Sequence, residues 1–181
     1  MQVPVVAFPA ALHESGPTRI IPFDLSEQLN VPYAATSPNL MASFLRINPG
    51  ESLETQAGAT SQAFYVIRGE GVTTSEHGEI QFSQGDLFVI PACDGAINHT
   101  ASEDTAIYWI TDEPLLQYLG VKASVCKFKP TLFRKERMLA EVERIKHQPG
   151  AEHRYTSSSS PLPHTHIYTT YLIIYISYLI L

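Results

Sequence analysis

The sequence has few basic residues and almost no cysteine. It holds 12 Lys and Arg against 18 Asp and Glu, which gives a formal net charge of -6 at pH 7. Phosphate binding needs a basic face, so this balance argues against nucleic acid as a partner. Two cysteines, Cys93 and Cys126, are too few for a disulfide framework and indicate a reducing, cytoplasmic setting.

Targeting and membrane signals are also lacking. Met1 to Ala11 has neither a basic region nor a long apolar run, so we expect no signal peptide. The uncharged stretch Ile167–Leu181 has fifteen residues. As a helix it would reach about 22 Å, which is short of the roughly 30 Å apolar core of a bilayer. We therefore expect no membrane partner, and we interpret this stretch as part of a disordered or artefactual tail.

What the sequence does contain, from Met41 onward, is a series of short apolar runs separated by turn residues. This alternation is typical of an all-β barrel or sandwich. A hairpin turn is predicted at His77-Gly78, where glycine permits a positive φ. The strands predicted in this region are Ala42–Ile47, Ala63–Ile67, Val72–Ser75, Glu79–Phe82, Leu87–Ile90 and Ala106–Ile110.

The flanking segments have a different character. Val3–Phe8 could form an edge strand, and one helical turn is expected just after Asp24. Helices are predicted over Glu113–Gly120 and Thr131–Lys146, the second with an apolar face that packs on the barrel or on a partner. We divide the chain into an N-terminal arm (1–37), a barrel (38–112), a helical extension (113–148) and the tail (149–181).

Two spaced motifs carry the main functional information. They read Gly50-x5-Gln56-x-Gly58-x3-Gln62-x6-Gly69 and Gly85-x5-Pro91-x-Cys93-x2-Ala96-x3-Thr100. This spacing resembles the two motifs of the cupin superfamily. The resemblance implies a double-stranded β-helix, or jelly-roll barrel, with an N-terminal arm and a C-terminal helix. It also implies that the family's ligands His, His, Glu and His are replaced here by Gln56, Gly58, Gln62 and Ala96.

A narrower resemblance covers Ala59–Gly71 and Tyr108–Gly120, which are similar to gentisate 1,2-dioxygenase-like bicupins. Such proteins have two cupin halves. The resemblance implies that this chain corresponds to one N-terminal half and that a metal site could lie in the missing second half.

The substituted positions do not suit a transition metal. An amide oxygen is a weak ligand, Gly58 offers no side chain, and Gln62 keeps the shape of glutamate without its charge. We therefore expect no cofactor. His99 lies three residues beyond Ala96, and strand alternation counted from Ala96 points Asn98 inward and His99 outward, as a rim or surface histidine.

Two further features are interpreted as carrying no chemistry. The pair His164 and His166 has the spacing of a metal motif but falls in the tail, where a chance pair is the simpler account. Cys93 is followed by Asp94, an anion that disfavours the thiolate, so we predict an unreactive thiol.

Five residues could line a pocket in the barrel: Gln56, Gln62, Phe64, Asn98 and His99. They would bind a small molecule such as an aromatic or carboxylate compound, or they would fill the interior and hydrogen-bond one another. The sequence leaves both readings open.

Two functions follow, and the sequence does not decide whether the protein is an enzyme. The first is a degenerate cupin that binds a small molecule or has a structural role. The alternative is an Fe- or Mn-dependent, gentisate-dioxygenase-like ring-cleaving cupin with a non-standard site around His99. The expected protein partner is a second copy in a homodimer, joined through exposed barrel edges and the arm, or the missing cupin half.

Overall fold

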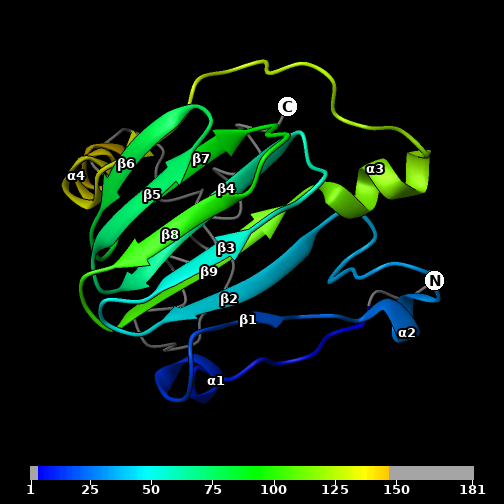
Figure 1. Cartoon of the computed structure of the whole chain (residues 1–181), viewed down its shortest axis with the longest axis horizontal. Coiled ribbons are helices and arrows are strands. Elements are labelled where there is room, and N and C mark those ends of the chain that lie inside the picture. The colour runs from blue at the N-terminus through cyan, green and yellow to red at the C-terminus, as the bar shows by residue number, and fades with distance from the viewer. Residues whose placement is uncertain (1–3, 147–181) are drawn as a thin grey trace. The chain divides into compact units, whose positions relative to one another are not determined.

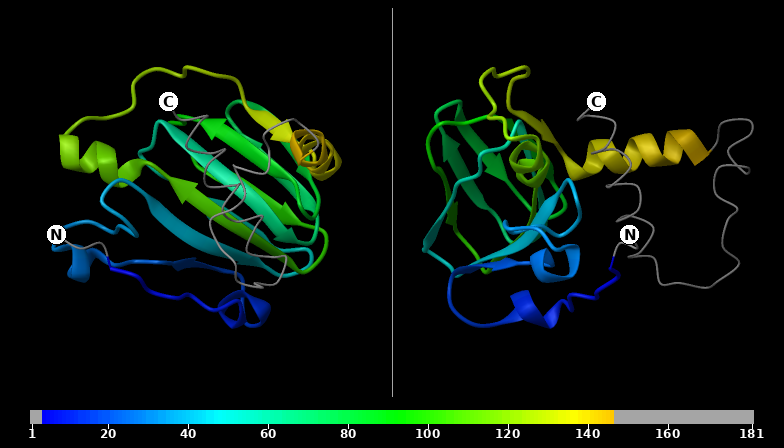
Figure 2. Two further views of the ribbon diagram at one scale, coloured as in Figure 1. Left: turned by 180° about the vertical axis from the view of Figure 1, so that it is seen from behind. Right: turned by 90° about the vertical axis from the view of Figure 1, so that its right-hand side faces the viewer.

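The computed structural model describes residues 4–146, and two antiparallel sheets dominate them (Figures 1 and 2). The larger sheet has six strands in the order β1-β2-β9-β4-β7-β10. Their bounds are β1 Arg19–Pro22, β2 Met41–Ile47, β9 Thr105–Thr111, β4 Ser61–Arg68, β7 Leu87–Pro91 and β10 Thr131–Phe133.

The smaller sheet has four strands in the order β3-β8-β5-β6 and faces the larger one (Figure 1). Their bounds are β3 Ser52–Thr55, β8 Ile97–Ala101, β5 Gly71–Ser75 and β6 Gly78–Phe82. From β2 to β5 and again from β6 to β9, consecutive strands alternate between the two sheets, as in a jelly roll. The predicted all-β jelly-roll fold is therefore confirmed.

The core lies between the two sheets because alternate residues of each strand face inward. In β8, for example, Ile97, His99 and Ala101 are buried and Thr100 is exposed. Aromatic rings fill the centre: the Phe64 and Phe88 centroids are 4.8 Å apart and nearly parallel. The buried apolar residues of this core are Leu45, Ala57, Ala59, Phe64, Val66, Phe82, Phe88, Ile90, Ile97, Ile107 and Trp109.

All six strands predicted from the apolar runs are present, and Gly78 has the expected positive φ of 112°. Residues 4–9 form no strand, so the prediction of an edge strand at Val3–Phe8 is wrong for its described part. The arm instead supplies β1, which pairs with β2 at the sheet edge. The missed strands β3 and β8 are rich in polar residues, and their pairing with each other defines them.

The described helices are short except for the last. They are α1 Ala11–Glu14, α2 Ser26–Leu29, α3 Glu113–Leu119 and α4 Lys135–Lys146. The helical turn expected after Asp24 and the stop at Gly120 are confirmed. Within residues 4–146 no helix is both long and apolar enough to cross a membrane.

The helix predicted from Thr131 begins only at Lys135, so its first turn was predicted wrongly. Thr131–Phe133 pairs with β7 instead. The buried Asp86 carboxylate fixes the change from strand to helix, because it accepts hydrogen bonds from Arg134 Nη1 (2.7 Å) and the Lys135 backbone N–H (3.0 Å). Packing of α4 on the barrel or a partner remains a prediction, as does the division into four segments. The tail at 149–181, with His164 and His166, lies outside the described residues.

One end of the barrel is held by ion pairs. Arg46 and Arg68 contact the two carboxylate oxygens of Asp104 at 2.8 and 2.9 Å. Arg68 also donates to His13 Nδ1 at 2.9 Å, and burial, with the nearby Arg68 charge, lowers the pKa of His13. The neutral imidazole can therefore accept this bond, which ties the arm to the barrel.

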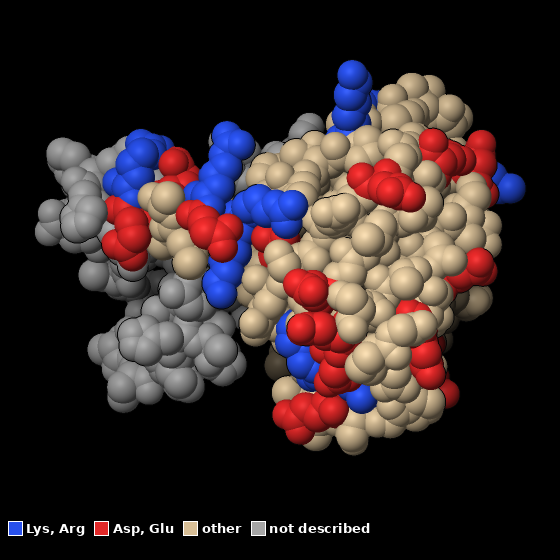
Figure 3. All heavy atoms as spheres, turned by 60° about the vertical axis from the view of Figure 1, so that its left-hand side comes forward, with Lys and Arg blue, Asp and Glu red and all other residues tan. Residues whose placement is uncertain are grey.

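On the face seen in Figure 3, acidic side chains gather around a few basic ones.

Candidate functional site

The two cupin-like motifs meet at one end of the barrel. Strand register sets this, since Thr55 lies opposite Ile97 and Ser61 lies opposite Pro91. The segments 56–60 and 92–96 therefore leave the sheets at the same end, next to the β5–β6 hairpin turn. We call this end, formed by residues 56–60, 76–77 and 92–96, the motif end.

The residues at the family's ligand positions do not fit a metal. Gln56 and Ala96 are exposed, and Gly58 contributes only its backbone N–H, which donates to Glu113 Oε1 at 3.1 Å. Gln62 is buried, and its Oε1 accepts a hydrogen bond from Trp109 Nε1 at 3.1 Å. The amide oxygen that could have served as a ligand is thus already engaged.

Segment 56–60 is fixed by the start of α3. The Asp112 carboxylate accepts hydrogen bonds from the backbone N–H of Thr60 (2.8 Å) and from the Thr60 hydroxyl. With this anchor, Ala57 and Ala59 face the core and Gln56 faces solvent. The pattern of ligand spacing is kept, but the side chains that would point into a metal site are absent.

His99 is inside the barrel, so the prediction of a rim or surface position is wrong. Its side chain is 0% exposed, and its ring centroid is 5.0 Å from that of Phe64. The alternation was counted from Ala96, but β8 begins only at Ile97, after an irregular segment that resets the direction of the side chains. Asn98 consequently points away from the core and is half-buried, and its Oδ1 has no hydrogen-bond partner within residues 4–146.

Two threonines occupy both nitrogens of His99. Nε2 lies 3.0 Å from Thr55 Oγ1 and Nδ1 lies 2.8 Å from Thr73 Oγ1. Burial lowers the pKa of His99 to about 3, so the imidazole is neutral. One nitrogen then donates to a hydroxyl and the other accepts from the second hydroxyl. This arrangement leaves no free lone pair on the ring for a metal.

Of the five predicted pocket residues, the structure brings three together. Gln62, Phe64 and His99 are buried, and Phe64 stacks on Phe88 beside the His99 ring. Gln56 and Asn98 do not join them. A ligand pocket lined by these residues remains a prediction.

A cluster of possible metal ligands at the motif end was not predicted from the sequence. Glu76, His77 and Cys93 offer ligand atoms that all lie within 4.8 Å of one another. Burial and the neighbouring Glu76, Cys126 and Asp94 raise the pKa of Cys93 to about 11, in the direction that the sequence predicted. The available signal was the hairpin at His77-Gly78, which the strand register places against the loop of the second motif.

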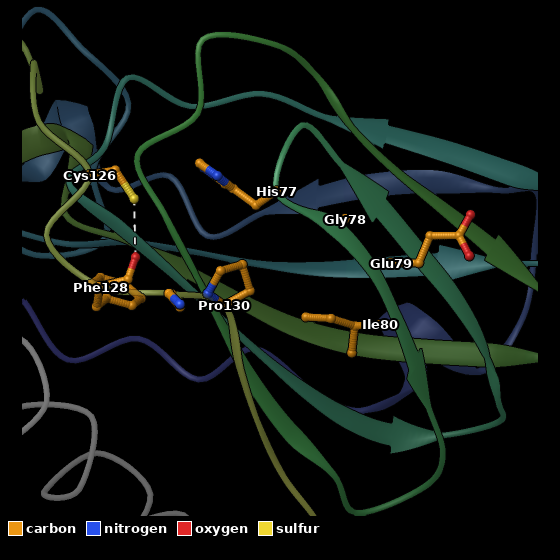
Figure 4. Close-up of a pocket in the computed structure, with 8 residues that line it drawn as sticks. His77, Gly78, Glu79, Ile80, Cys126, Phe128 and Pro130 are labelled. Atoms are coloured by element: carbon orange, nitrogen blue, oxygen red, sulfur yellow. Dashed lines mark hydrogen bonds between the residues drawn. The ribbon is translucent and has the colours of Figure 1, made fainter.

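A surface groove of about 430 Å³ adjoins this cluster. In Figure 4 the His77 imidazole points from the hairpin turn towards the segment that carries Cys126. The groove is lined by His77, Gly78, Glu79, Ile80, Cys126, Phe128, Lys129 and Pro130.

Comparison with known proteins agrees with the resemblance seen in the motifs. No protein-family model matches the chain. Over 86 residues it is 30% identical to a 5-aminosalicylate 1,2-dioxygenase from Comamonas sp., a match that covers 48% of this chain and 23% of the relative. The chain thus spans about a quarter of that curated relative and resembles one part of it.

The solved structures that are similar to this chain have lower identity. A salicylate 1,2-dioxygenase from Pseudaminobacter salicylatoxidans is 17% identical, with a TM-score of 0.49 over 68% of this chain and 32% of its own. A cupin superfamily protein from Desulfitobacterium hafniense is 19% identical, with a TM-score of 0.43 over 56% of this chain and 84% of its own.

Proposed function

We propose that this chain is a cupin-type barrel without the family's metal site, with a structural or ligand-binding role in a longer dioxygenase-like assembly. The observation that carries the proposal is the state of the interior polar groups. Both nitrogens of His99 and the amide oxygen of Gln62 are bonded to neighbouring side chains inside an aromatic core.

The cost of leaving buried polar groups without partners supports a structural role for the polar residues in the barrel interior. Buried polar groups are stable when partnered, and leaving one unpartnered costs about 1 to 3 kcal/mol. A metal bound by His99 would break a threonine contact and need further ligands from positions where this chain has Gly58 and Ala96. Those positions offer no donor side chain.

The alternative is an Fe- or Mn-dependent ring-cleaving enzyme. The 1,2-dioxygenase name of the curated relative favours it. It requires His99 and at least two more ligands in the interior. If the ligand is instead held without a metal, we propose a small aromatic or carboxylate compound at the motif end, in keeping with the aminosalicylate named for that relative.

A metal analysis separates the two functions. The full chain, purified without added metal or chelator, is expected to contain Fe and Mn far below one ion per chain. His99→Gln, which cannot supply an imidazole ligand, is expected to leave that content unchanged. Elemental analysis by mass spectrometry measures both proteins. Near-stoichiometric iron or manganese that is lost in His99→Gln would contradict the proposed function and establish the alternative.

We also propose that the protein partner is a second barrel, either another copy or a separate half. The edge strand β1 supports this, since its outer edge has no partner strand within residues 4–146 and Ile20 on it is exposed. Light scattering on the purified full chain is expected to give twice the chain mass. A monomer mass at all concentrations tested would exclude the homodimer and leave the second half as the partner.

A further inference from the structure

The cluster of Glu76, His77 and Cys93 joins two separate parts of the chain. Glu76 and His77 lie in the β5–β6 hairpin turn, and Cys93 follows β7. The three ligand atoms lie within 4.8 Å of one another. In a tetrahedral zinc site, ligand bonds of about 2.0 to 2.3 Å put the donors roughly 3.3 to 3.7 Å apart. Small side-chain movements would therefore bring these donors into range.

Hydrogen bonds already hold the two segments together. The His77 Nε2–H donates to the Ala92 carbonyl at 2.9 Å, and the Asp94 backbone N–H donates to Glu76 Oε1 at 3.3 Å. Unlike His99, whose two nitrogens are both bonded to hydroxyls, His77 in this tautomer has its lone pair on Nδ1, where it could bind an ion. The hairpin and the loop are thus fixed against each other without a metal. Such pre-organisation lowers the entropy cost of collecting ligands from two segments.

The chemistry of the donors selects the kind of ion. Thiolate, imidazole and carboxylate are the ligand types of zinc and similar divalent transition metals, whereas magnesium and calcium take oxygen ligands. Glu76 and Asp94 place negative charge beside Cys93, although burial is the main reason that the pKa of its thiol is raised. The same charge favours a cation at this position.

We propose that Glu76, His77 and Cys93 form a binding site for a divalent transition metal ion such as Zn²⁺ at the motif end, outside the barrel interior. Three protein ligands leave the fourth tetrahedral position for water or another small ligand. His77 also lines the groove, so the bound ion would border it. This site is independent of the substituted cupin positions, and it does not use His99.

Cobalt titration tests the proposal directly. The full chain with His164→Ala and His166→Ala serves as the background, because that pair could bind metal by itself. Co²⁺ is added under reducing conditions, and Zn²⁺ affinity follows by competition. We expect one Co²⁺ per chain with a thiolate-to-cobalt charge-transfer band. Cys93→Ser should abolish the band, and His77→Ala should weaken binding by at least about 100-fold.

Cys126→Ser is the matched control. Cys126 is an exposed thiol in the same groove, outside the three-residue cluster, and its loss is expected to leave the Co²⁺ affinity unchanged. Glu76→Gln, an exposed and nearly isosteric change, provides a variant that should fold normally and bind about 10-fold more weakly. Circular dichroism of each variant checks the fold.

The outcomes separate this inference from the proposed function. Binding that survives both Cys93→Ser and His77→Ala, or that is lost only in Cys126→Ser, overturns the proposed metal site at the motif end. An ion lost only in His99→Gln would overturn the metal-free interior instead. Zinc that depends on Cys93, together with negligible iron and manganese, supports both proposals.

Discussion

Replacement of His99 by alanine is expected to lower the free energy of unfolding by about 3 to 5 kcal/mol. The side chain is fully buried against the Phe64 ring, so its removal leaves a cavity in the aromatic core. It also leaves the hydroxyls of Thr55 and Thr73 without their partner. Urea unfolding followed by circular dichroism measures the change.

Asn98→Ala is the matched control on the same strand. Asn98 points away from the core, and its Oδ1 has no hydrogen-bond partner within residues 4–146. Its truncation is expected to cost less than about 1 kcal/mol, since no contact to the core is lost. If the side chains alternated as counted from the sequence, Asn98→Ala would destabilise the protein more than His99→Ala. A larger effect for Asn98→Ala than for His99→Ala would show that β8 presents the opposite face to the core.

Acid should destabilise the protein through the same residue. Burial lowers the pKa of His99 to about 3, against an ordinary value of 6.5. Between these values the unfolded chain binds a proton that the folded chain does not, so stability falls as the pH falls. The slope is about 1.4 kcal/mol per pH unit, and the full window amounts to roughly 5 kcal/mol.

The comparison of wild type with His99→Gln isolates this effect. Glutamine can hydrogen-bond to the threonines but does not titrate, and the other acid-sensitive groups, including His13, are present in both proteins. We expect the stability difference between the two proteins to shrink steadily from pH 6.5 to pH 4 in urea unfolding series. Parallel stability curves over that range would mean that His99 is not a buried neutral imidazole.

The secondary structure of the barrel was largely predictable, for a physical reason. Runs such as Ala42–Ile47 and Leu87–Ile90 are apolar enough to be buried, and the glycines between them mark turns. Of the strands in the smaller sheet, β3 and β8 were missed. They expose alternate polar residues, and they exist because β8 pairs with β3 on one side and with β5 on the other. Local sequence carries little of that information.

The candidate sites, too, could be predicted from the sequence only in part. The motif spacing was enough to identify the substituted positions Gln56, Gly58, Gln62 and Ala96. It could not orient His99, because a strand's inward face is set by where its pairing begins, and β8 begins one residue after Ala96. It also could not join Glu76 and His77 to Cys93, since that contact depends on how a hairpin and a loop meet across two strands.

The sequence by itself determined an all-β barrel and the residues that stand at the cupin-like ligand positions, because apolar alternation and motif spacing are local properties of the chain. Only the tertiary structure decided that His99 is a satisfied core residue and that a thiol, an imidazole and a carboxylate meet at the motif end. Both results depend on strand register, which long-range hydrogen bonds and side-chain packing fix together.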